Sequence, residues 1–164
     1  DRGVKASAIQ RGFKTFTGVE HRLEEVGTIR GLRCVNDSKA TNVDSTLVAL
    51  RAFEEAHKAS KNILLIMGGQ HKGLPYTPLR GGIDRVVKAI LSIGGAARKI
   101  EEDLGEGLVP IFPCGSLATA VDTAFKIGAK GDILLLSPAC ASFDQFQDFE
   151  DRGRQFKELA RSMQ

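Results

Sequence analysis

Two short runs of apolar residues place the strongest constraint on how this chain can fold. They cover residues 62–67 (NILLIM) and 132–136 (DILLL). A strand that is covered by helices on both faces shows a continuous apolar run, whereas a strand with one face in water alternates apolar and polar residues. We therefore predict that both runs are central strands of a mostly parallel sheet.

Strand-like and helix-like patterns alternate along the rest of the chain. The further predicted strands are a hairpin of 21–26 and 28–35, turning at Gly27 or later at Gly31, followed by 87–93 and 108–112. The predicted helices cover 4–16, 45–59, 96–104, 116–127 and 144–163, with a short one inside 76–85. This alternation predicts an α/β fold, a Rossmann-like three-layer sandwich. Its mostly parallel sheet would have about six strands, one of them antiparallel and contributed by the hairpin.

A glycine interrupts the last predicted helix. Gly153 lies in its middle, where glycine costs about 1 kcal/mol relative to alanine. We therefore predict that another part of the chain approaches the backbone closely at this position.

The bulk composition is that of an ordinary globular protein. The 164 residues are predicted to form one domain, 1–164, and the net charge of +3 without a Lys/Arg run gives no sign of nucleic-acid binding. No apolar run is long enough to span a bilayer, so we expect no membrane contact. The three cysteines lack Cys-x-x-Cys spacing, which favours a reducing, cytoplasmic location over a disulfide framework. Because the chain opens on Asp1 without a methionine, we expect it to be a piece of a longer protein.

The polar loop at 35–42 (VNDSKATN) follows a predicted strand and precedes a predicted helix. In open α/β sheets, ligands bind at the carboxyl ends of the strands. If the loop is roughly extended, the side chains of Asp37, Lys39 and Thr41 project to one side, because side chains alternate in that geometry. The loop would then offer an acid, a cation and a hydroxyl in a row.

Two other loops follow strong strands, at 68–72 and 137–142, and right-handed crossovers would bring all three loops to one edge. Together they supply Lys39, Thr41, Lys72 and Ser142, the last of which we place near a helix N-terminus. This set suits a ligand with carboxylates, because cations and helix N-termini both favour anions. The alternative, that these are solvated loop lysines and a capping serine, stays open at this point.

Other candidate motifs are weak. The loop GGQHKG at 68–73 lacks the spacing of a Walker motif, and Gly94-Gly95 lacks that of a dinucleotide fingerprint. His21-Arg22 opens the predicted hairpin, where Arg22 could meet a phosphate or simply lie in water. No group of His, Cys, Asp and Glu has metal-ligand spacing, so no metal site is predicted in this chain.

Four stretches resemble one known family over nearly the whole chain. They are GVEHRLE at 18–24, VNDSKATN at 35–42, LSPACASFDQF at 136–146 and FEDRGRQF at 149–156. In this order they resemble the C-terminal, amino-acid-binding domain of the bacterial D-glutamate-adding Mur ligases. Sister ligases that add other amino acids carry a different loop at the position of 36–42.

The resemblance implies an ATP-dependent, amide-forming ligase of peptidoglycan synthesis. It would join D-glutamate to UDP-N-acetylmuramoyl-L-alanine through an acyl phosphate. Carried onto this sequence, it implies that Thr41 and Lys72 hold one carboxylate of D-glutamate and that Ser142 holds the other. The full implied D-glutamate set is Lys39, Thr41, Lys72, Ser142, Phe143 and Phe149. The residues implied to face the nucleotide are His21, Arg22 and Asp37.

The resemblance also implies what this chain lacks. ATP and Mg²⁺ would be bound mainly by a central ATPase domain, and UDP by a further domain, neither of which is in the sequence. We therefore predict no turnover by this chain alone, and none of its residues is assigned a catalytic role. Gln70 and His71 stand before Lys72, where the family usually has an aspartate or a glycine. Two alternatives remain, a folylpolyglutamate synthetase-type domain that adds L-glutamate and a non-enzymatic ligand-binding module.

Overall fold

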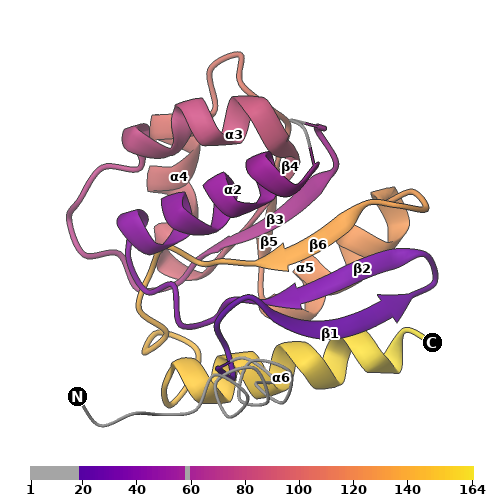
Figure 1. The fold of residues 1–164 in the computed structure, drawn as a ribbon. Coiled ribbons are helices and arrows are strands. Elements are labelled where there is room, and N and C mark those ends of the chain that lie inside the picture. Colours follow the sequence, from indigo (N-terminus) through magenta and orange to yellow (C-terminus); the bar gives the residue numbers. More distant parts are fainter. Residues whose placement is uncertain (1–18, 58–59) are drawn as a thin grey trace, which may run out of the picture.

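A computed structural model of the chain describes residues 19–57 and 60–164, and it shows a six-stranded sheet between two layers of helices (Figure 1). The strand order is β1-β2-β6-β3-β4-β5. Their bounds are Glu24–Ile29, Leu32–Asn36, Ile63–Gly68, Val87–Ile93, Ile111–Gly115 and Ile133–Leu136 for β1 to β6. β1 pairs with β2 in the antiparallel sense, and every other pair is parallel. The predicted fold class is confirmed.

The two continuous apolar runs occupy the middle of the sheet. Every residue of β3 and β6 is buried, because helices cover both faces at these strands. On one face lie α2 (Val43–His57), α3 (Arg80–Val86) and α4 (Ala97–Leu104), whose apolar side chains share one core.

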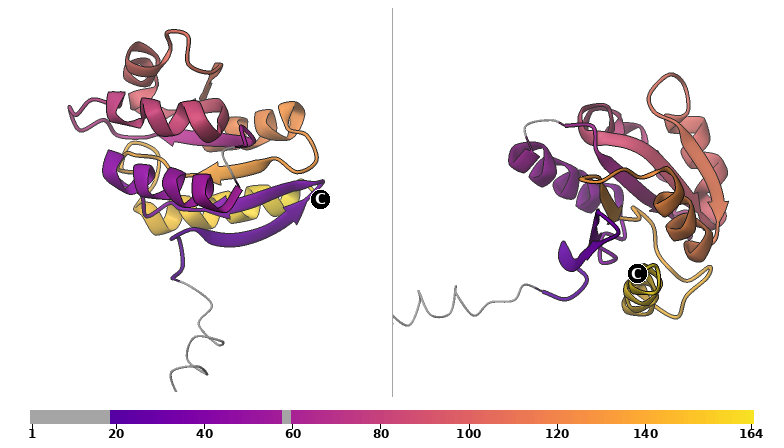
Figure 2. Two further views of the ribbon diagram at one scale, coloured as in Figure 1. Left: turned by 45° about the horizontal axis from the view of Figure 1, so that its top comes forward. Right: turned by 90° about the vertical axis from the view of Figure 1, so that its right-hand side faces the viewer.

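The opposite face of the sheet is covered by two helices. α5 (Leu117–Ile127) is capped by Ser116, whose Oγ accepts a hydrogen bond from the Thr119 amide. α6 (Phe149–Ser162) packs against α5 and the β1–β2 hairpin, and the right-hand view of Figure 2 shows it end-on beside that hairpin. None of the helices in the described ranges is both long and apolar enough to cross a bilayer.

The hairpin turns at the later of the two predicted positions. Arg30 and Gly31 both have positive φ values and connect β1 to β2. Gly27 instead lies within β1, where the register between the two strands shifts. The prediction of a turn at Gly27 is therefore wrong, since Gly27 lies at a β-bulge within β1.

Some predicted boundaries differ from the observed ones. α6 begins at Phe149 rather than at 144, because Ser142 to Phe146 form an isolated turn and Asp148 caps the helix, accepting a hydrogen bond from the Asp151 amide. β5 begins at Ile111 rather than 108. A short 3₁₀ turn, Thr77–Leu79, precedes α3 in the region predicted to hold a short helix. The helix predicted at 4–16 lies outside the described residues.

Candidate functional site

The loops after β2, β3 and β6 meet at one edge of the sheet. These strands are neighbours in the order β2-β6-β3, so their carboxyl ends lie side by side. The loop after β3 bonds to the loop after β6 through Gly68 N to Pro138 O and Gln70 N to Ala141 O, both at 2.9 Å. The predicted convergence of the three loops is thus present.

The loop after β2 is not extended. The Ala40 amide donates to the Asp37 carbonyl at 2.9 Å, which closes a turn. As a result Asp37 is buried, 5% exposed, whereas Lys39 is exposed. The extended conformation on which the row of Asp37, Lys39 and Thr41 depended is therefore absent; Asp37 and Lys39 line one pocket, and Thr41 lines another.

Asp37 joins this loop to two other segments. Its Oδ2 accepts a hydrogen bond from Ser137 Oγ at 2.8 Å, and its Oδ1 accepts one from the Leu23 amide at 3.2 Å. Burial raises the pKa of Asp37 from 3.8 to about 6, although these two hydrogen bonds and the charge of Arg22 act in the opposite direction. A carboxyl group with this pKa changes its charge close to neutral pH.

Thr41 and Lys72 lie close together in the structure. The Lys72 ammonium lies 3.4 Å from the Thr41 carbonyl oxygen, although the two residues come from different loops. Both line a small pocket together with Asn42, Val43, His71, Leu74, Tyr76 and Ala139. Behind Lys72, Tyr76 Oη lies 3.2 Å from His71 Nδ1 and 2.9 Å from Cys140 Sγ, so the β3 loop is linked to the β6 loop by side chains as well.

Ser142 lies in the β6 loop and is 2% exposed. Its carbonyl accepts from the Gln145 and Phe146 amides within the isolated turn. The prediction that Ser142 lies near the N-terminus of the last helix is therefore wrong, because α6 begins only at Phe149. The next side chain, Phe143, is 68% exposed.

Phe149 and Lys39 approach each other across the β2 loop. The Lys39 ammonium lies 5.5 Å from the centroid of the Phe149 ring, in a cation–π arrangement. The Phe149 carbonyl in turn accepts a hydrogen bond from Ser38 Oγ at 2.7 Å. The first residue of α6 is therefore held against the loop that carries Lys39 and Thr41.

Arg22 and Asp37 line a second, open-sided pocket of about 270 Å³. Its other lining residues include Lys39 and the apolar Leu23, Val48 and Ala49. His21 does not line it. The His21 ring is 3% exposed, lies edge-on to Phe149, and has its Nδ1 2.9 Å from Asn36 Nδ2.

The described residues include one group with metal-ligating atoms close together, namely Glu20, His21 and Glu24. Lys157 already pairs with both glutamates, at 2.7 and 3.0 Å. Mg²⁺ prefers octahedral oxygen ligands with several waters. A buried imidazole and two lysine-paired carboxylates do not fit that ion, so this chain offers no Mg²⁺ site among them.

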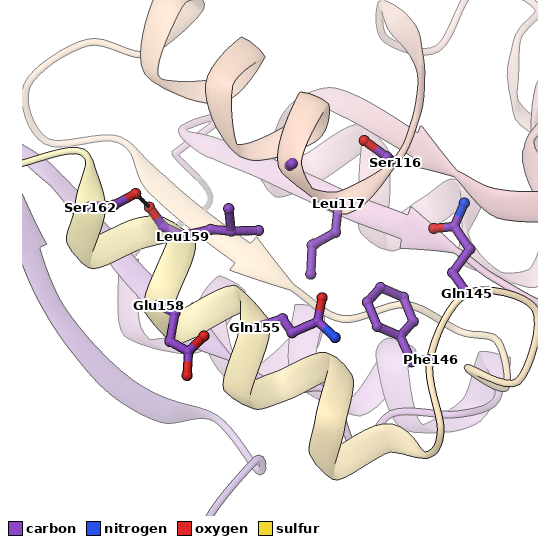
Figure 3. A pocket seen from close by; sticks show the side chains of 9 residues that line it. Ser116, Leu117, Gln145, Phe146, Gln155, Glu158, Leu159 and Ser162 are labelled. Atoms are coloured by element: carbon purple, nitrogen blue, oxygen red, sulfur yellow. Dashed lines mark hydrogen bonds between the residues drawn. The ribbon is translucent and has the colours of Figure 1, made fainter.

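A further pocket of about 590 Å³ lies between α5 and α6 (Figure 3). Leu117, Phe146 and Leu159 form its apolar part, and Ser116, Gln145, Gln155, Glu158 and Ser162 surround them. None of the predicted site residues lines it.

Residues that sequence reasoning missed hold the loops in place. Asn36 Oδ1 accepts from the Ser38 amide at 3.1 Å, and Arg152 contacts Ser38 and Cys140 from α6. Arg152 lies one turn before Phe156 on the buried face of α6. That position could have identified it, since a cation on an apolar face requires buried partners.

Comparison with known proteins identifies the family. Residues 21–140 match the family described as "Mur ligase, glutamate ligase domain", and the chain belongs to this family. It is 51% identical over 158 residues to the UDP-N-acetylmuramoylalanine–D-glutamate ligase of Anaeromyxobacter dehalogenans. It is 47% identical over 161 residues to the enzyme of the same name from Elusimicrobium minutum. These matches cover 96% and 98% of the chain but 33% and 34% of the relatives, so the chain spans about a third of their length.

Solved structures with low sequence identity share the fold. UDP-N-acetylmuramate–alanine ligase from Thermotoga maritima matches 99% of the chain and 35% of its own, with a TM-score of 0.67 and 14% identity. Folylpolyglutamate synthase from Mycobacterium tuberculosis matches 93% of the chain and 35% of its own, with a TM-score of 0.63 and 13% identity. At such identities these structures support the fold alone.

Proposed function

We propose that this chain is the D-glutamate-binding, C-terminal domain of an ATP-dependent ligase that adds D-glutamate to UDP-N-acetylmuramoyl-L-alanine in peptidoglycan synthesis. Relatives of that name match nearly the full chain at about half identity. The observation that carries the proposal is the position of Lys72, whose ammonium lies 3.4 Å from the Thr41 carbonyl oxygen. The loop that carries Lys72 is hydrogen-bonded to the β6 loop, which carries Ser142. Three loops distant in sequence thus present donors at one edge.

D-Glutamate carries two carboxylates, which need two separated sets of donors. In the proposal Lys72 and Thr41 bind one carboxylate, with Lys39 alongside. Ser142 and the backbone near Phe143 and Phe149 bind the other. A hydrogen bond to a charged group contributes about 1.5–3 kcal/mol, so each set would contribute substantially to binding.

Arg22 and Asp37 would face the nucleotide, since both line the open-sided pocket beside Lys39. The predicted role of His21 would be indirect, because its ring is buried against α6 and could act only through the position of Arg22. In the intact enzyme, bound ATP would supply the phosphoryl group that activates the acceptor carboxylate, and Mg²⁺ would offset the negative charge of the phosphates. Mg²⁺ and the phosphates would be bound mainly by the central domain. We also retain a cytoplasmic location as a prediction, which the three free cysteines support.

The folylpolyglutamate synthetase alternative has weaker support. The similarity to that enzyme is 13% identity, whereas ligases that add D-glutamate match at 47–51%. A non-enzymatic module of the same fold has no supporting observation among these comparisons.

Substrate choice in the intact ligase tests the proposal. The measurement is ADP release with D-glutamate or L-glutamate as the amino acid, and with UDP-N-acetylmuramoyl-L-alanine or a folate as the acceptor. We expect turnover only with D-glutamate and the UDP-linked acceptor. Turnover with L-glutamate and the folate would establish the alternative instead.

A further inference from the structure

One arginine of α6 joins the loops of the candidate site from behind. Arg152 is 0% exposed, and its guanidinium donates three hydrogen bonds to those loops. Its Nε donates to Ser38 Oγ at 2.9 Å and its Nη2 to the Ser38 carbonyl at 2.8 Å. Its Nη1 donates to the Cys140 carbonyl at 3.1 Å. A single planar group therefore fixes the separation of the β2 and β6 loops.

The same contacts reach the side chains proposed to bind D-glutamate. Ser38 directly precedes Lys39, and its hydroxyl, which accepts from Arg152, donates to the Phe149 carbonyl at 2.7 Å. Cys140 precedes Ser142 by two residues, and its thiol lies 2.9 Å from Tyr76 Oη. Displacing the guanidinium would thus move both proposed sets of carboxylate donors.

The charge of Arg152 is also unusual. Each of its hydrogen bonds goes to a neutral oxygen, and no carboxylate among residues 19–57 and 60–164 forms a salt bridge with it. Asp144 interacts with it only electrostatically, and its Oδ2 accepts from the Gly95 amide instead. Burial lowers the pKa of Arg152 to about 10, so it remains charged at neutral pH. A buried cation without an ion-pair partner favours a nearby anion.

We propose that Arg152 is a positioning residue of the D-glutamate site, one that fixes the two donor loops at their binding separation and adds a positive charge behind them. This rests on the proposed function of the chain. The substrate anion then adds a counter-charge, since no carboxylate of the described residues forms an ion pair with Arg152.

The test uses the intact ligase with four single substitutions. Arg152→Met removes both the charge and the three hydrogen bonds, whereas Arg152→Lys keeps the charge but not the planar fork. Ser38→Ala removes only the hydroxyl between Arg152 and Phe149. Arg161→Met is the matched control, since Arg161 lies on the same helix and is exposed. The readouts are the melting temperature, kcat, and the KM values for D-glutamate and ATP.

We expect Arg152→Met to raise the KM for D-glutamate by about tenfold or more, and Arg152→Lys to restore part of that loss, because the charge remains. The KM for ATP and the kcat at saturating D-glutamate should change by less than about threefold, a split that general loss of stability does not produce. Arg161→Met should leave the KM for D-glutamate unchanged. If Arg152→Met does not fold, Ser38→Ala carries the test, with an expected rise in KM of about threefold or more.

A folded Arg152→Met enzyme with the wild-type KM for D-glutamate would overturn the proposal, as would an unchanged KM in Ser38→Ala when only that variant folds. Equal KM values in the Arg152→Lys and Arg152→Met enzymes would contradict the part assigned to the charge. The wild-type enzyme separates the two proposals. A wild-type enzyme that does not use D-glutamate refutes the proposed function, whereas one that uses it with variants of unchanged KM refutes only the role of Arg152.

Discussion

The backbone of Gly153 lies directly against the imidazole ring of His21. A Cβ atom at position 153 would lie 2.8 Å from His21 Cε1 and closer still to Nδ1. The close approach predicted from a glycine in the middle of a helix is therefore confirmed. It lets α6 pack against the start of the hairpin, where His21 contacts Asn36 and Phe149.

Gly153→Ala should lower the free energy of unfolding by about 1–3 kcal/mol, because overpacking at His21 outweighs the gain of about 1 kcal/mol in helix propensity. Urea denaturation of the chain measures this change. Gly81→Ala is the matched control, since that helical glycine has only the end of the Arg85 side chain nearby, at 3.4 Å. The control should be neutral or stabilising. Loss of the Gly153→Ala effect in a His21→Asn background would confirm the contact, and equal effects in both backgrounds would exclude it.

The buried carboxyl group of Asp37 should make stability depend on pH. Its folded-state pKa of about 6 lies above its ordinary value of 3.8. Between these values the unfolded state loses the proton while the folded state keeps it, so the free energy of unfolding falls as pH rises through this window. Above pH 6 both states are ionised, and the full cost of up to about 3 kcal/mol persists.

Asp37→Asn removes this titration. Relative to the wild-type chain, the variant should therefore gain up to about 3 kcal/mol in stability between pH 4 and pH 7. Urea denaturation of both proteins at the two pH values measures the difference. A stability difference that is the same at pH 4 and pH 7 would show that Asp37 has an ordinary pKa.

Substitutions at the proposed carboxylate contacts should weaken D-glutamate use. In the intact ligase, Lys72→Met and Ser142→Ala should each raise the KM for D-glutamate by about 10- to 100-fold, corresponding to the loss of one charged hydrogen bond. Steady-state kinetics with varied D-glutamate measures this. Lys61→Met is a suitable control, because Lys61 pairs with Asp84 and precedes β3, whereas the candidate loops follow the carboxyl ends of their strands. A normal KM in the Lys72→Met enzyme would remove Lys72 from the site.

The isolated chain should not turn over. Phosphate-binding groups and metal ions supply most of the catalysis in phosphoryl transfer, and the cluster of Glu20, His21 and Glu24 in the described residues does not fit Mg²⁺. A coupled assay for ADP, with ATP, Mg²⁺, D-glutamate and UDP-N-acetylmuramoyl-L-alanine all present, measures this. ADP release that depends on D-glutamate would contradict the expectation.

The layers of the fold could be predicted because they depend on local pattern. The runs at 62–67 and 132–136 are apolar throughout since both faces of β3 and β6 are covered. The start of α6 could not be predicted this way. The sequence from 144 to 148 is compatible with a helix. The chain instead forms a turn in which the Gln145 and Phe146 amides donate hydrogen bonds to the Ser142 carbonyl.

The candidate site could be predicted only in part, because some of its contacts join segments that are distant in sequence. The edge at which the loops meet follows from strand order, so Thr41 and Lys72 could be brought together from sequence. The burial of Asp37 depends on a turn within the β2 loop and on a hydrogen bond from Ser137. The contact of Arg152 with Ser38 joins positions on different elements, and no periodic pattern encodes it.

The most direct test of the D-glutamate site is an NMR titration of the intact ligase, isotope-labelled only in these 164 residues. D-Glutamate and L-glutamate are added separately while the backbone amide signals are followed. We predict saturable shifts at Thr41, Lys72 and Ser142 with the D form, and much weaker shifts with the L form. Equal responses to both forms, or shifts confined to other parts of the chain, would contradict the account.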